Sequence, residues 1–179
     1  MPEFHFLRSE PLLQARAFRV RRDFLRAPDG RETAYDIIEH TGSVVLVPID
    51  EEGNVLFVRQ FRPAAGKELL ELPAGTLDEG EPFESCAARE LREETGLAAS
   101  HLEKIGEFFL VPGYSTEFMA VFIATGLRPD PLPGDPDEFL KLERFPMNET
   151  LRMAEGGEIP DAKSLAAILI ARSRLIPQL

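Results

Sequence analysis

The sequence lacks the features that mark a secreted or membrane-bound protein. Its 179 residues include one cysteine, Cys86, which excludes an intramolecular disulfide and any cysteine-based zinc cluster. No apolar segment at the N-terminus has the character of a secretory signal, and no apolar run reaches the roughly 18 residues that span a membrane. These absences predict a protein of the reducing cytoplasm that does not enter a membrane.

Histidine is also scarce, and this argues against one class of hydrolytic mechanism. His5, His40 and His101 are widely separated and form no pattern with a serine that would indicate a catalytic triad. Cys86 lies within a predicted helix, where we expect it to pack rather than to act as a nucleophile. The chain contains no internal repeat and no low-complexity tract.

The net charge of −11 is carried by one part of the chain. Residues 1–40 are neutral, with seven arginines and seven acidic residues, whereas residues 41–179 contain 13 basic and 24 acidic residues. Such an acidic body repels nucleic acid, so no nucleic-acid partner is expected. If it binds a phosphorylated small molecule, a divalent cation is the expected bridge.

Alternating and β-branched segments predict a series of strands. Two hairpins are expected, one turning at Asp29-Gly30 and one at residues 50–54. The predicted strands are 15–26, 33–40, 43–49, 55–61, 69–72, 105–111, 118–124 and 139–145. Residues 128–138 are rich in proline, aspartate and glycine and are expected to form a mobile loop.

Three helices are predicted among these strands. The first covers 82–95, with Pro82 in its first turn and Gly96 as its stop. A second is expected from a cap at Asn148 to Ala154, and a third from about Asp161 to about Arg174. Strands and helices mixed in this order predict an α/β fold, an α/β/α sandwich.

The most informative segment runs from Gly75 to Leu97. On a helix, Glu90 and Glu94 share one face and Glu93 lies beside them. Taken alone, three such glutamates are more typical of a solvated acidic face. Like charges at this spacing destabilise a helix unless a cation lies there, and hard oxygen ligands suit Mg²⁺ or Mn²⁺. Gly75 allows a tight backbone turn, which would let the Ala74 carbonyl face the same metal.

The full spacing of this segment resembles the Nudix box. The box reads Gly-x5-Glu-x7-Arg-Glu-apolar-x-Glu-Glu-x-Gly-apolar, and all nine specified positions match here. The resemblance implies a Nudix fold with a mixed β-sheet over about residues 41–175. It also implies that Glu90 and Glu94 are the principal metal ligands, that Glu93 assists them, and that Arg89 and Glu81 form a structural ion pair.

Three further segments resemble the ADP-ribose pyrophosphatase branch of that family. Pro112, Gly113 and Tyr114 match its proline-glycine-aromatic loop, and residues 58–63, with Arg59 and Arg62, match a strand whose second arginine contacts phosphates. A guanidinium suits a pair of pyrophosphate oxygens. On the sequence alone, a surface arginine at a strand end fits Arg62 equally well. Residues 71–75 match the branch's entry into the box.

The catalytic base is the open position in this resemblance. The branch places it in a late acidic loop, and the best register puts Glu138 on a metal-site or base position but Pro136 where some members have the base glutamate. Glu117 is the second candidate for the base, and Asp135 and Asp137 are weaker ones. In the expected mechanism a water attacks one phosphorus of ADP-ribose and a loop carboxylate takes its proton, giving AMP and ribose 5-phosphate.

Two alternatives remain open from the sequence. One is the same chemistry on FAD, NADH or a nucleotide sugar; the other is a Nudix-fold module that senses a nucleotide without catalysis. Such a module is expected to lose box carboxylates, and this chain keeps them all. The resemblance also implies a homodimer in which residues 1–40 form a β arm joined to a catalytic domain of residues 41–179. Phe18, Phe24 and Tyr35 are then expected in a core or interface, with adenine stacking by one of them as a lesser alternative.

Overall fold

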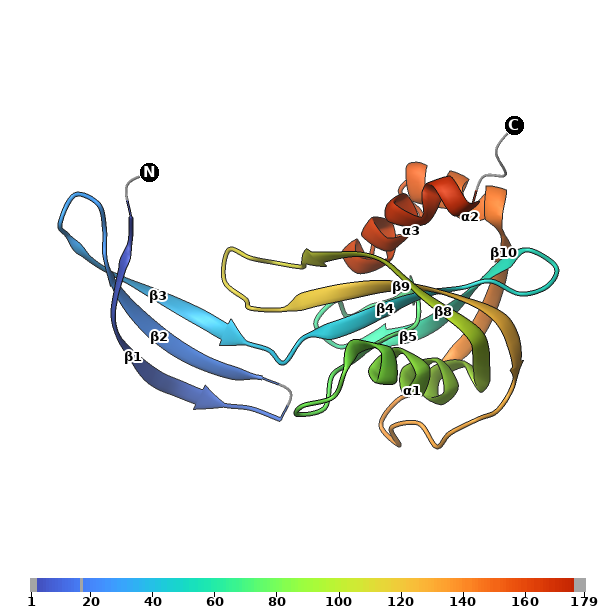
Figure 1. Ribbon diagram of the computed structural model, residues 1–179, viewed down its shortest axis with the longest axis horizontal. Coiled ribbons are helices and arrows are strands. Elements are labelled where there is room, and N and C mark those ends of the chain that lie inside the picture. Colours follow the sequence, from blue (N-terminus) through green and yellow to red (C-terminus); the bar gives the residue numbers. More distant parts are fainter. Residues whose placement is uncertain (1–2, 17, 176–179) are drawn as a thin grey trace. The chain divides into compact units, whose positions relative to one another are not determined.

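The computed structural model describes residues 3–16 and 18–175, so residues 1, 2 and 17 of the expected arm and 176–179 of the expected catalytic domain lie outside it. The chain divides into two compact units (Figure 1). The first unit comprises Met1–Gly42 with Phe109–Phe118, and the second comprises Ser43–Phe108 with Met119–Leu179. Each unit is described separately below.

The first unit is built on an antiparallel sheet in the order β1-β2-β3. Its strands are β1 (His5–Gln14), β2 (Arg19–Arg26) and β3 (Glu32–Glu39). The predicted hairpin at Asp29-Gly30 is confirmed, and Gly30 there has a positive φ of 86°. The sequence did not predict β1, because register shifts after Phe6 and Pro11 break the two-residue alternation that identifies a strand.

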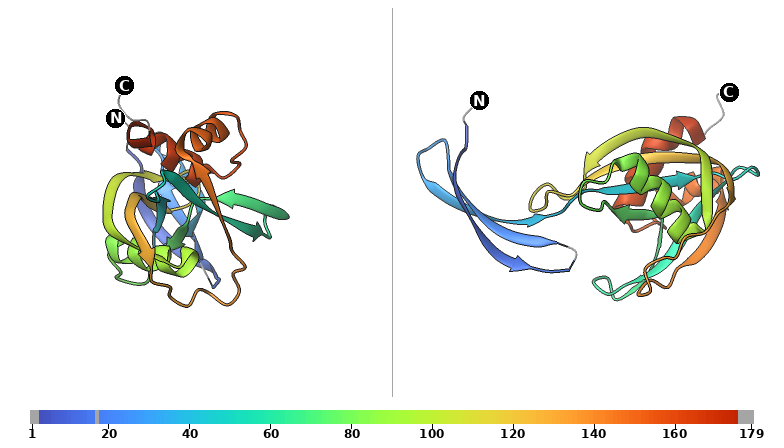
Figure 2. Two further views of the ribbon diagram at one scale, coloured as in Figure 1. Left: turned by 90° about the vertical axis from the view of Figure 1, so that its right-hand side faces the viewer. Right: turned by 60° about the horizontal axis from the view of Figure 1, so that its bottom comes forward.

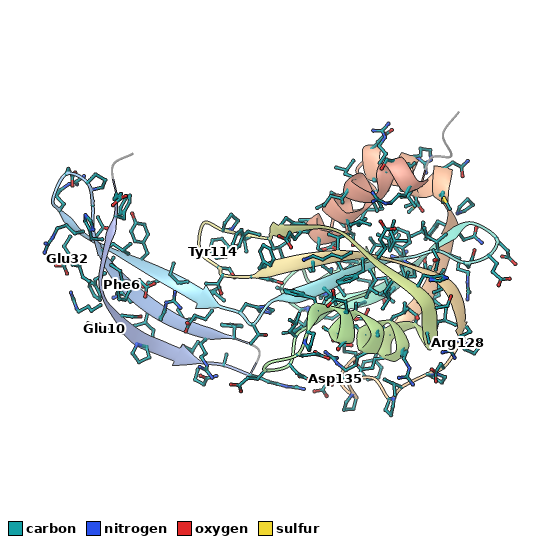
Figure 3. The ribbon with its side chains drawn as sticks, in the orientation of Figure 1. Phe6, Glu10, Glu32, Tyr114, Arg128 and Asp135 are labelled. Carbon is teal, nitrogen blue, oxygen red and sulfur yellow. The ribbon has the colours of Figure 1, made fainter. Side chains whose placement is uncertain are left out.

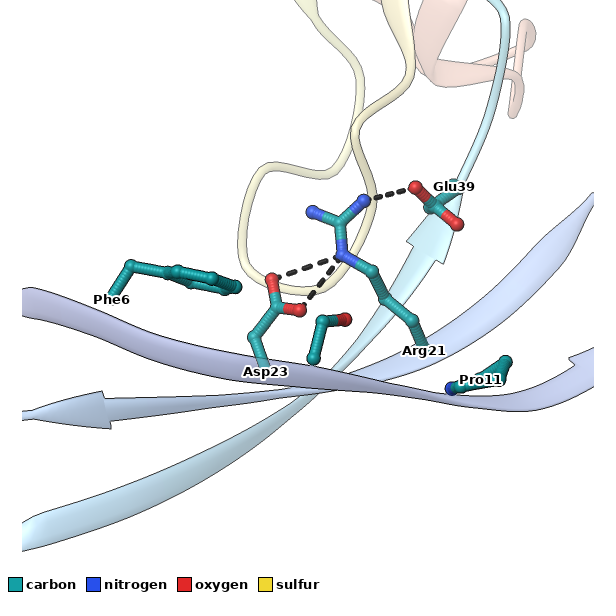
Figure 4. A pocket seen from close by; sticks show the side chains of 6 residues that line it. Phe6, Pro11, Arg21, Asp23 and Glu39 are labelled. Carbon is teal, nitrogen blue, oxygen red and sulfur yellow. Dashed lines mark hydrogen bonds and ion pairs between the residues drawn. The ribbon is translucent and has the colours of Figure 1, made fainter.

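This sheet carries little apolar core of its own. Among the described residues of the unit, only Ala27 is a buried hydrophobic residue. Phe4, Phe6, Leu13 and Tyr35 are between 43% and 62% exposed. A pocket of about 480 Å³ on the sheet is lined partly by Phe6 and by the Arg21 side chain, which binds both Asp23 and Glu39 (Figure 4). Exposed aromatic and aliphatic side chains gathered in one small unit are typical of an interaction surface.

The second unit contains two sheets. The first has the order β7-β4-β9-β8, in which β4 (Ser43–Pro48) pairs parallel with β9 (Phe118–Pro129) and antiparallel with β7 (Ala74–Thr76). Its fourth strand is β8 (Leu97–Phe109). The second sheet is antiparallel, with β5 at its centre, and contains β10 (Lys141–Pro146), β5 (Asn54–Arg62) and β6 (Lys67–Glu71) in that order.

Helices cover the mixed sheet and give the predicted α/β/α sandwich. Helices α1 (Phe83–Thr95) and α3 (Ala162–Leu175) both contact β4 and lie on opposite sides of it (Figures 1 and 2). The α1 core residues Cys86, Ala87 and Leu91 have no exposed surface. Burial also raises the pKa of the Cys86 thiol far above its usual value, so Cys86 packs as expected. Helix α2 (Met147–Glu155) lies against β10 and β5.

Most element boundaries agree with the sequence, and the disagreements have physical causes. Strand β8 begins at Leu97, well before the predicted residue 105; its first half was missed because apolar and polar residues do not alternate there. Asn148 is not a helix cap: Pro146 occupies the N-cap of α2, without a side-chain cap hydrogen bond. Gly96 ends α1 in the left-handed region as predicted, and the Asp161 carboxylate accepts from the Ser164 amide at the start of α3. None of the helices in the described ranges is both long and apolar enough to cross a membrane.

Candidate active site

Strand β7 and helix α1 bring the ends of the box motif into contact. A Cβ built on Gly75 would lie 1.8 Å from Cδ of Glu90, so any larger residue would displace that carboxylate. Gly75 does not have a positive φ. Its role therefore differs from the tight turn that we predicted: it is the missing side chain, rather than an unusual backbone angle, that the site requires.

Two of the box carboxylates, Glu90 and Glu94, lie against the strand that precedes the helix. The backbone N–H of Ala74 donates to Oε2 of Glu94 at 3.0 Å. Glu90 is buried and accepts from Nη1 of Arg89 at 2.7 Å, and Glu93 accepts from the same nitrogen at 2.9 Å. Helical spacing has therefore placed Glu94 beside the Ala74 backbone and Glu90 beside Gly75, while Glu93 shares the Arg89 nitrogen with Glu90.

The electrostatics of these carboxylates are those of a site that is short of positive charge. Burial, together with the charges of Glu90 and Glu138, raises the pKa of Glu94 to about 8. Burial also raises the pKa of Glu90 to about 7, and the charges of Glu93 and Glu138 act in the same direction. Desolvated like charges disfavour ionisation, whereas a divalent cation would favour it. The donor set, all oxygen, is the one that Mg²⁺ and Mn²⁺ prefer.

Glu138 is the loop residue that the structure brings to this cluster. It is exposed, in the segment between β9 and β10, and its charge acts on both Glu90 and Glu94. Within residues 3–16 and 18–175, no three His, Cys, Asp or Glu side chains converge closely enough to hold a metal as they stand. Glu90 is turned towards Arg89 and Glu94 towards Ala74, so metal binding would require these side chains to leave their present partners.

Arg89 binds several parts of the box motif at once. Its guanidinium binds both carboxylate oxygens of Glu81, at 3.0 and 2.8 Å, which gives the ion pair expected from the sequence. It also donates to the Thr76 carbonyl at 3.1 Å, which ties the helix to the end of β7. Hydrogen bonding to Arg89 lowers the pKa of Glu81 to about 2, so this carboxylate stays ionised.

A buried ion network beside the box was missed from the sequence. Glu71, only 1% exposed, accepts from Nε and Nη2 of Arg62 at 2.8 and 2.7 Å and also binds the Lys163 ammonium. Lys163 donates to Asp161 at 2.8 Å, and its charge acts on Glu94. The available signal was the single lysine in the apolar first half of α3. A buried cation requires a partner, but the sequence does not say that the partner is Glu71.

The two arginines of β5 lie in different surroundings. Side chains alternate along a strand, so Arg59 and Arg62 project from opposite faces of β5. Arg59 forms a bidentate pair with Glu143 of β10 at 2.8 and 3.1 Å, and the other acid that acts on it is Glu68. Arg62, by contrast, is influenced by Glu94. The structure therefore places Arg62, but not Arg59, with the box.

The remaining predicted site residues belong to the first unit. Pro112, Gly113, Tyr114 and Glu117 occupy the turn between β8 and β9, and Tyr114 is exposed (Figure 3). The Tyr114 carbonyl accepts from the Ile38 amide at 2.8 Å. This turn is thus fastened to the end of β3.

Comparison with known proteins agrees with this geometry. A family model described as NUDIX domain matches residues 39–168. The chain is 39% identical over 170 residues to an ADP-ribose pyrophosphatase of Mycobacterium tuberculosis, covering 93% of this chain and 82% of that protein. It is 36% identical over 143 residues to an ADP-ribose pyrophosphatase of Bacillus subtilis, covering 79% and 77%. A crystal structure of an ADP compounds hydrolase superposes with a TM-score of 0.87 at 26% identity, covering 97% of this chain and 94% of that one.

Proposed function

The chain belongs to the NUDIX family and is a hydrolase of that family, within which we propose ADP-ribose as its substrate, with AMP and ribose 5-phosphate as products. The observation that carries this proposal is the complete set of box carboxylates, with Glu94 held at the Ala74 backbone, in a chain similar over most of its length to two proteins named ADP-ribose pyrophosphatase. A non-catalytic sensing role has no comparable support, because no box carboxylate is lost.

Nudix hydrolases are generally dependent on a divalent metal. We propose Mg²⁺ here, with Mn²⁺ able to replace it, held by Glu90, Glu94 and the Ala74 carbonyl with help from Glu93 and Glu138. Such a cation neutralises pyrophosphate charge and acidifies water. The site fits this group, because its carboxylates have raised pKa values that a cation would reverse.

The protein's own residues supply the rest of the chemistry. Arg62, fixed on Glu71, presents a guanidinium that suits two pyrophosphate oxygens. Arg89 holds Glu81 and Glu93 in place, and it holds Glu90 until that carboxylate turns to the metal. A water attacks one phosphorus, the bond from that phosphorus to the bridging oxygen breaks, and Glu138 accepts the proton of the water. The substrate contacts of Pro112, Gly113 and Tyr114 that the resemblance implies stay a prediction.

Substrate and metal are tested together by a panel assay. Purified protein with Mg²⁺ is offered ADP-ribose, FAD, NADH and nucleotide sugars, and the nucleotide products are separated and identified. We expect ADP-ribose to give the highest kcat/KM, AMP to appear as product, and EDTA to abolish turnover because the acidic site repels phosphate without a cation. Mn²⁺ should restore turnover. A higher kcat/KM for another substrate would replace ADP-ribose while keeping the chemistry, whereas the absence of hydrolysis across the panel would reject the proposal.

Arg62→Ala should raise KM for ADP-ribose by about 10-fold to 100-fold, the value of one or two charge-assisted hydrogen bonds, with a smaller change in kcat. Arg59→Ala is the matched control, since it removes an arginine from the same strand that is also paired with a glutamate. We expect KM of Arg59→Ala to stay within about twofold of wild type because Arg59 projects from the other face. Steady-state kinetics at saturating Mg²⁺ measure both. If the two substitutions raise KM equally, Arg62 does not contact the phosphates.

We further propose that the protein is a homodimer and that the arm formed by residues 1–40 contributes to the dimer interface. The exposed side chains of Phe4, Phe6, Leu13 and Tyr35 support this, because a sheet with so little apolar burial gains from a partner. Light scattering on the full chain should give about twice its 20.0 kDa mass. A monomer at micromolar concentration would contradict the proposal. The cytoplasmic location stays a prediction.

A further inference from the structure

The segment that carries Glu138 is fastened to the end of the box helix. The Asp130 amide donates to the Gly96 carbonyl at 3.0 Å, and the Leu132 amide donates to the Arg92 carbonyl at 3.3 Å. The Arg92 side chain donates to the Asp130 carbonyl at 3.0 Å and to its carboxylate at 3.1 Å. Arg92 therefore binds this segment through both its backbone and its guanidinium, and the segment runs along α1 (Figure 1).

Arg92 occupies the one position between Arg89 and Glu94 whose identity the box pattern leaves open. On a helix, residues two apart do not face each other, so Arg92 points away from the face that carries Glu90 and Glu94. It lies in the last turn of α1, where a cation is favoured by the helix dipole. Arg92 is thus built into the box helix but directed to the neighbouring segment rather than to the metal face.

We call the contacts between the Arg92 guanidinium and Asp130 the clamp. A tight turn connects this clamp to Glu138. The Glu138 amide donates to the Asp135 carbonyl at 2.9 Å, and the Asp137 amide donates to the Asp135 carboxylate at 2.9 Å. Pro136 occupies the second position of the turn, where its fixed φ is favourable, and aspartate is favoured at the first position. Asp135 is labelled beneath α1 in Figure 3. The residue that departs from the acidic family pattern therefore shapes the turn that presents Glu138.

The chain between the clamp and the turn also stays close to the helix. A Cβ built on Gly134 would lie 3.4 Å from the Glu93 carbonyl oxygen, so a backbone position only four residues before Glu138 lies beside the box helix. Contacts at Asp130, Leu132 and Gly134 leave few rotatable bonds between the helix and the turn. These contacts give the segment a course along α1 in the structure, and the mobility expected from its composition stays a prediction.

We propose that Arg92 is a positioning residue, whose clamp on Asp130, together with the Asp135-Pro136 turn, sets the place of Glu138 over the box carboxylates. The inference rests on the proposed function, because it assigns Glu138 a part in the hydrolysis. Its physical reason is the steep dependence of reaction rate on geometry: a displacement of about 1 Å can cost about 100-fold in rate. A preset carboxylate also loses less conformational entropy when the substrate binds.

The test compares four substitutions that separate the clamp from general damage. Arg92→Ala removes both guanidinium contacts to Asp130 and Asp130→Ala removes the contact to its carboxylate, whereas Asp130→Asn retains an oxygen acceptor for the guanidinium. Arg128→Ala is the matched control, because Arg128 is a largely exposed arginine whose Nη1 lies 3.9 Å from the same carboxylate, beyond hydrogen-bond distance. We expect the first two to lower kcat by about 10-fold to 50-fold and the last two to stay within about twofold of wild type. KM should change little in all four.

A double-substitution cycle shows whether Arg92 acts through Glu138. In the Glu138→Gln background, Arg92→Ala should lower kcat by no more than about twofold further, because the group that it positions is already gone. If Arg92→Ala lowers kcat by the same factor in the Glu138→Gln background as in wild type, the proposal is overturned. If Glu138→Gln leaves kcat unchanged while Arg92→Ala lowers it, the clamp does not act through Glu138 and the proposal fails, although the hydrolase function stands.

A second readout does not depend on activity. In the metal-free protein, Arg92→Ala should accelerate hydrogen exchange at the Leu132 and Glu138 amides by at least about tenfold relative to Arg128→Ala, because the clamp that closes both sites is lost. Exchange at the β4 amides should be unchanged, which excludes global destabilisation. Unaltered exchange at Glu138 would overturn the clamp even in a protein that hydrolyses ADP-ribose. If wild type hydrolyses none of the panel, the proposed function fails, and accelerated exchange would still support the clamp.

Discussion

Replacing Glu94 with glutamine should lower kcat by a factor on the order of 10²–10⁴, the usual effect of removing a major catalytic or charge-stabilising group. Glutamine keeps the size of the side chain and the acceptor for the Ala74 amide, but it removes the negative charge that we propose holds Mg²⁺. Glu84→Gln is the matched control, since Glu84 is exposed on the same helix. We expect Glu84→Gln to retain activity within about twofold, because a surface change away from the site has a small effect. If Glu94→Gln retains most of its activity, Glu94 is not a metal ligand.

The same substitution should change the pH dependence of stability in the metal-free protein. Folding raises the pKa of Glu94 from 4.5 to about 8, so the folded state holds this proton more tightly than the unfolded state. Stability from this group is therefore fully present below the unfolded pKa and is lost as the pH rises through the folded value. Wild type should unfold at a lower temperature at about pH 9 than at about pH 6, and Glu94→Gln should lose less over that interval. Saturating Mg²⁺ should stabilise wild type more than the variant.

These two readouts address different causes of inactivity. A misfolded variant would lose both activity and stability, whereas a variant that has lost a metal ligand keeps its fold and tolerates high pH better than wild type. The cost of desolvated carboxylates in the metal-free state is the expected consequence of a site built for a cation. If Tm of the two proteins falls in parallel between about pH 6 and about pH 9, the carboxyl of Glu94 is not the desolvated group described here.

Local pattern made the box predictable, because its geometry depends on residues close in sequence. Spacings of three and four along α1 place Glu90, Glu93 and Glu94 on adjoining positions of one helix, whatever the rest of the fold does. The Arg89–Glu81 pair also lies within the motif. The sequence therefore predicted the helix, its glycine end and its cluster of acids.

Long-range pairing made the rest of the site unpredictable from one sequence. Glu71 meets Lys163 across 92 residues, and no local periodicity links the two positions. The sequence placed Arg59 and Arg62 in one strand motif, but it did not reveal that Arg59 pairs with Glu143 and Arg62 with Glu71. Residues 128–138 were judged by composition alone, whereas the structure extends β9 to Pro129 and binds Asp130 to Arg92 of another element. The sequence did not predict strand β1, because its register shifts interrupt the alternation of side chains between the two faces of the sheet.

The assignment of Glu138 as the catalytic base decides which group takes the proton of the attacking water. Glu138→Gln should lower kcat by a factor on the order of 10²–10⁴, because a general base contributes about that much. The structural reason is that Glu138 is the loop carboxylate whose charge acts on both Glu90 and Glu94. Glu117→Gln is the comparison, since Glu117 is the other candidate and lies in the turn fastened to β3. We expect it to have the smaller effect.

Separate measurement of kcat and of metal affinity distinguishes the two roles open to Glu138. A base should lower kcat with little change in the affinity for Mn²⁺, measured by electron paramagnetic resonance, whereas a metal ligand should weaken both. We expect the first pattern, because Glu138 is exposed to water on the segment that runs beside α1, whereas Glu90 is buried and Glu94 is half-buried. If neither Glu138→Gln nor Glu117→Gln slows turnover by more than about tenfold, neither is the base, and the attacking water would have to lose its proton without a dedicated carboxylate of the protein.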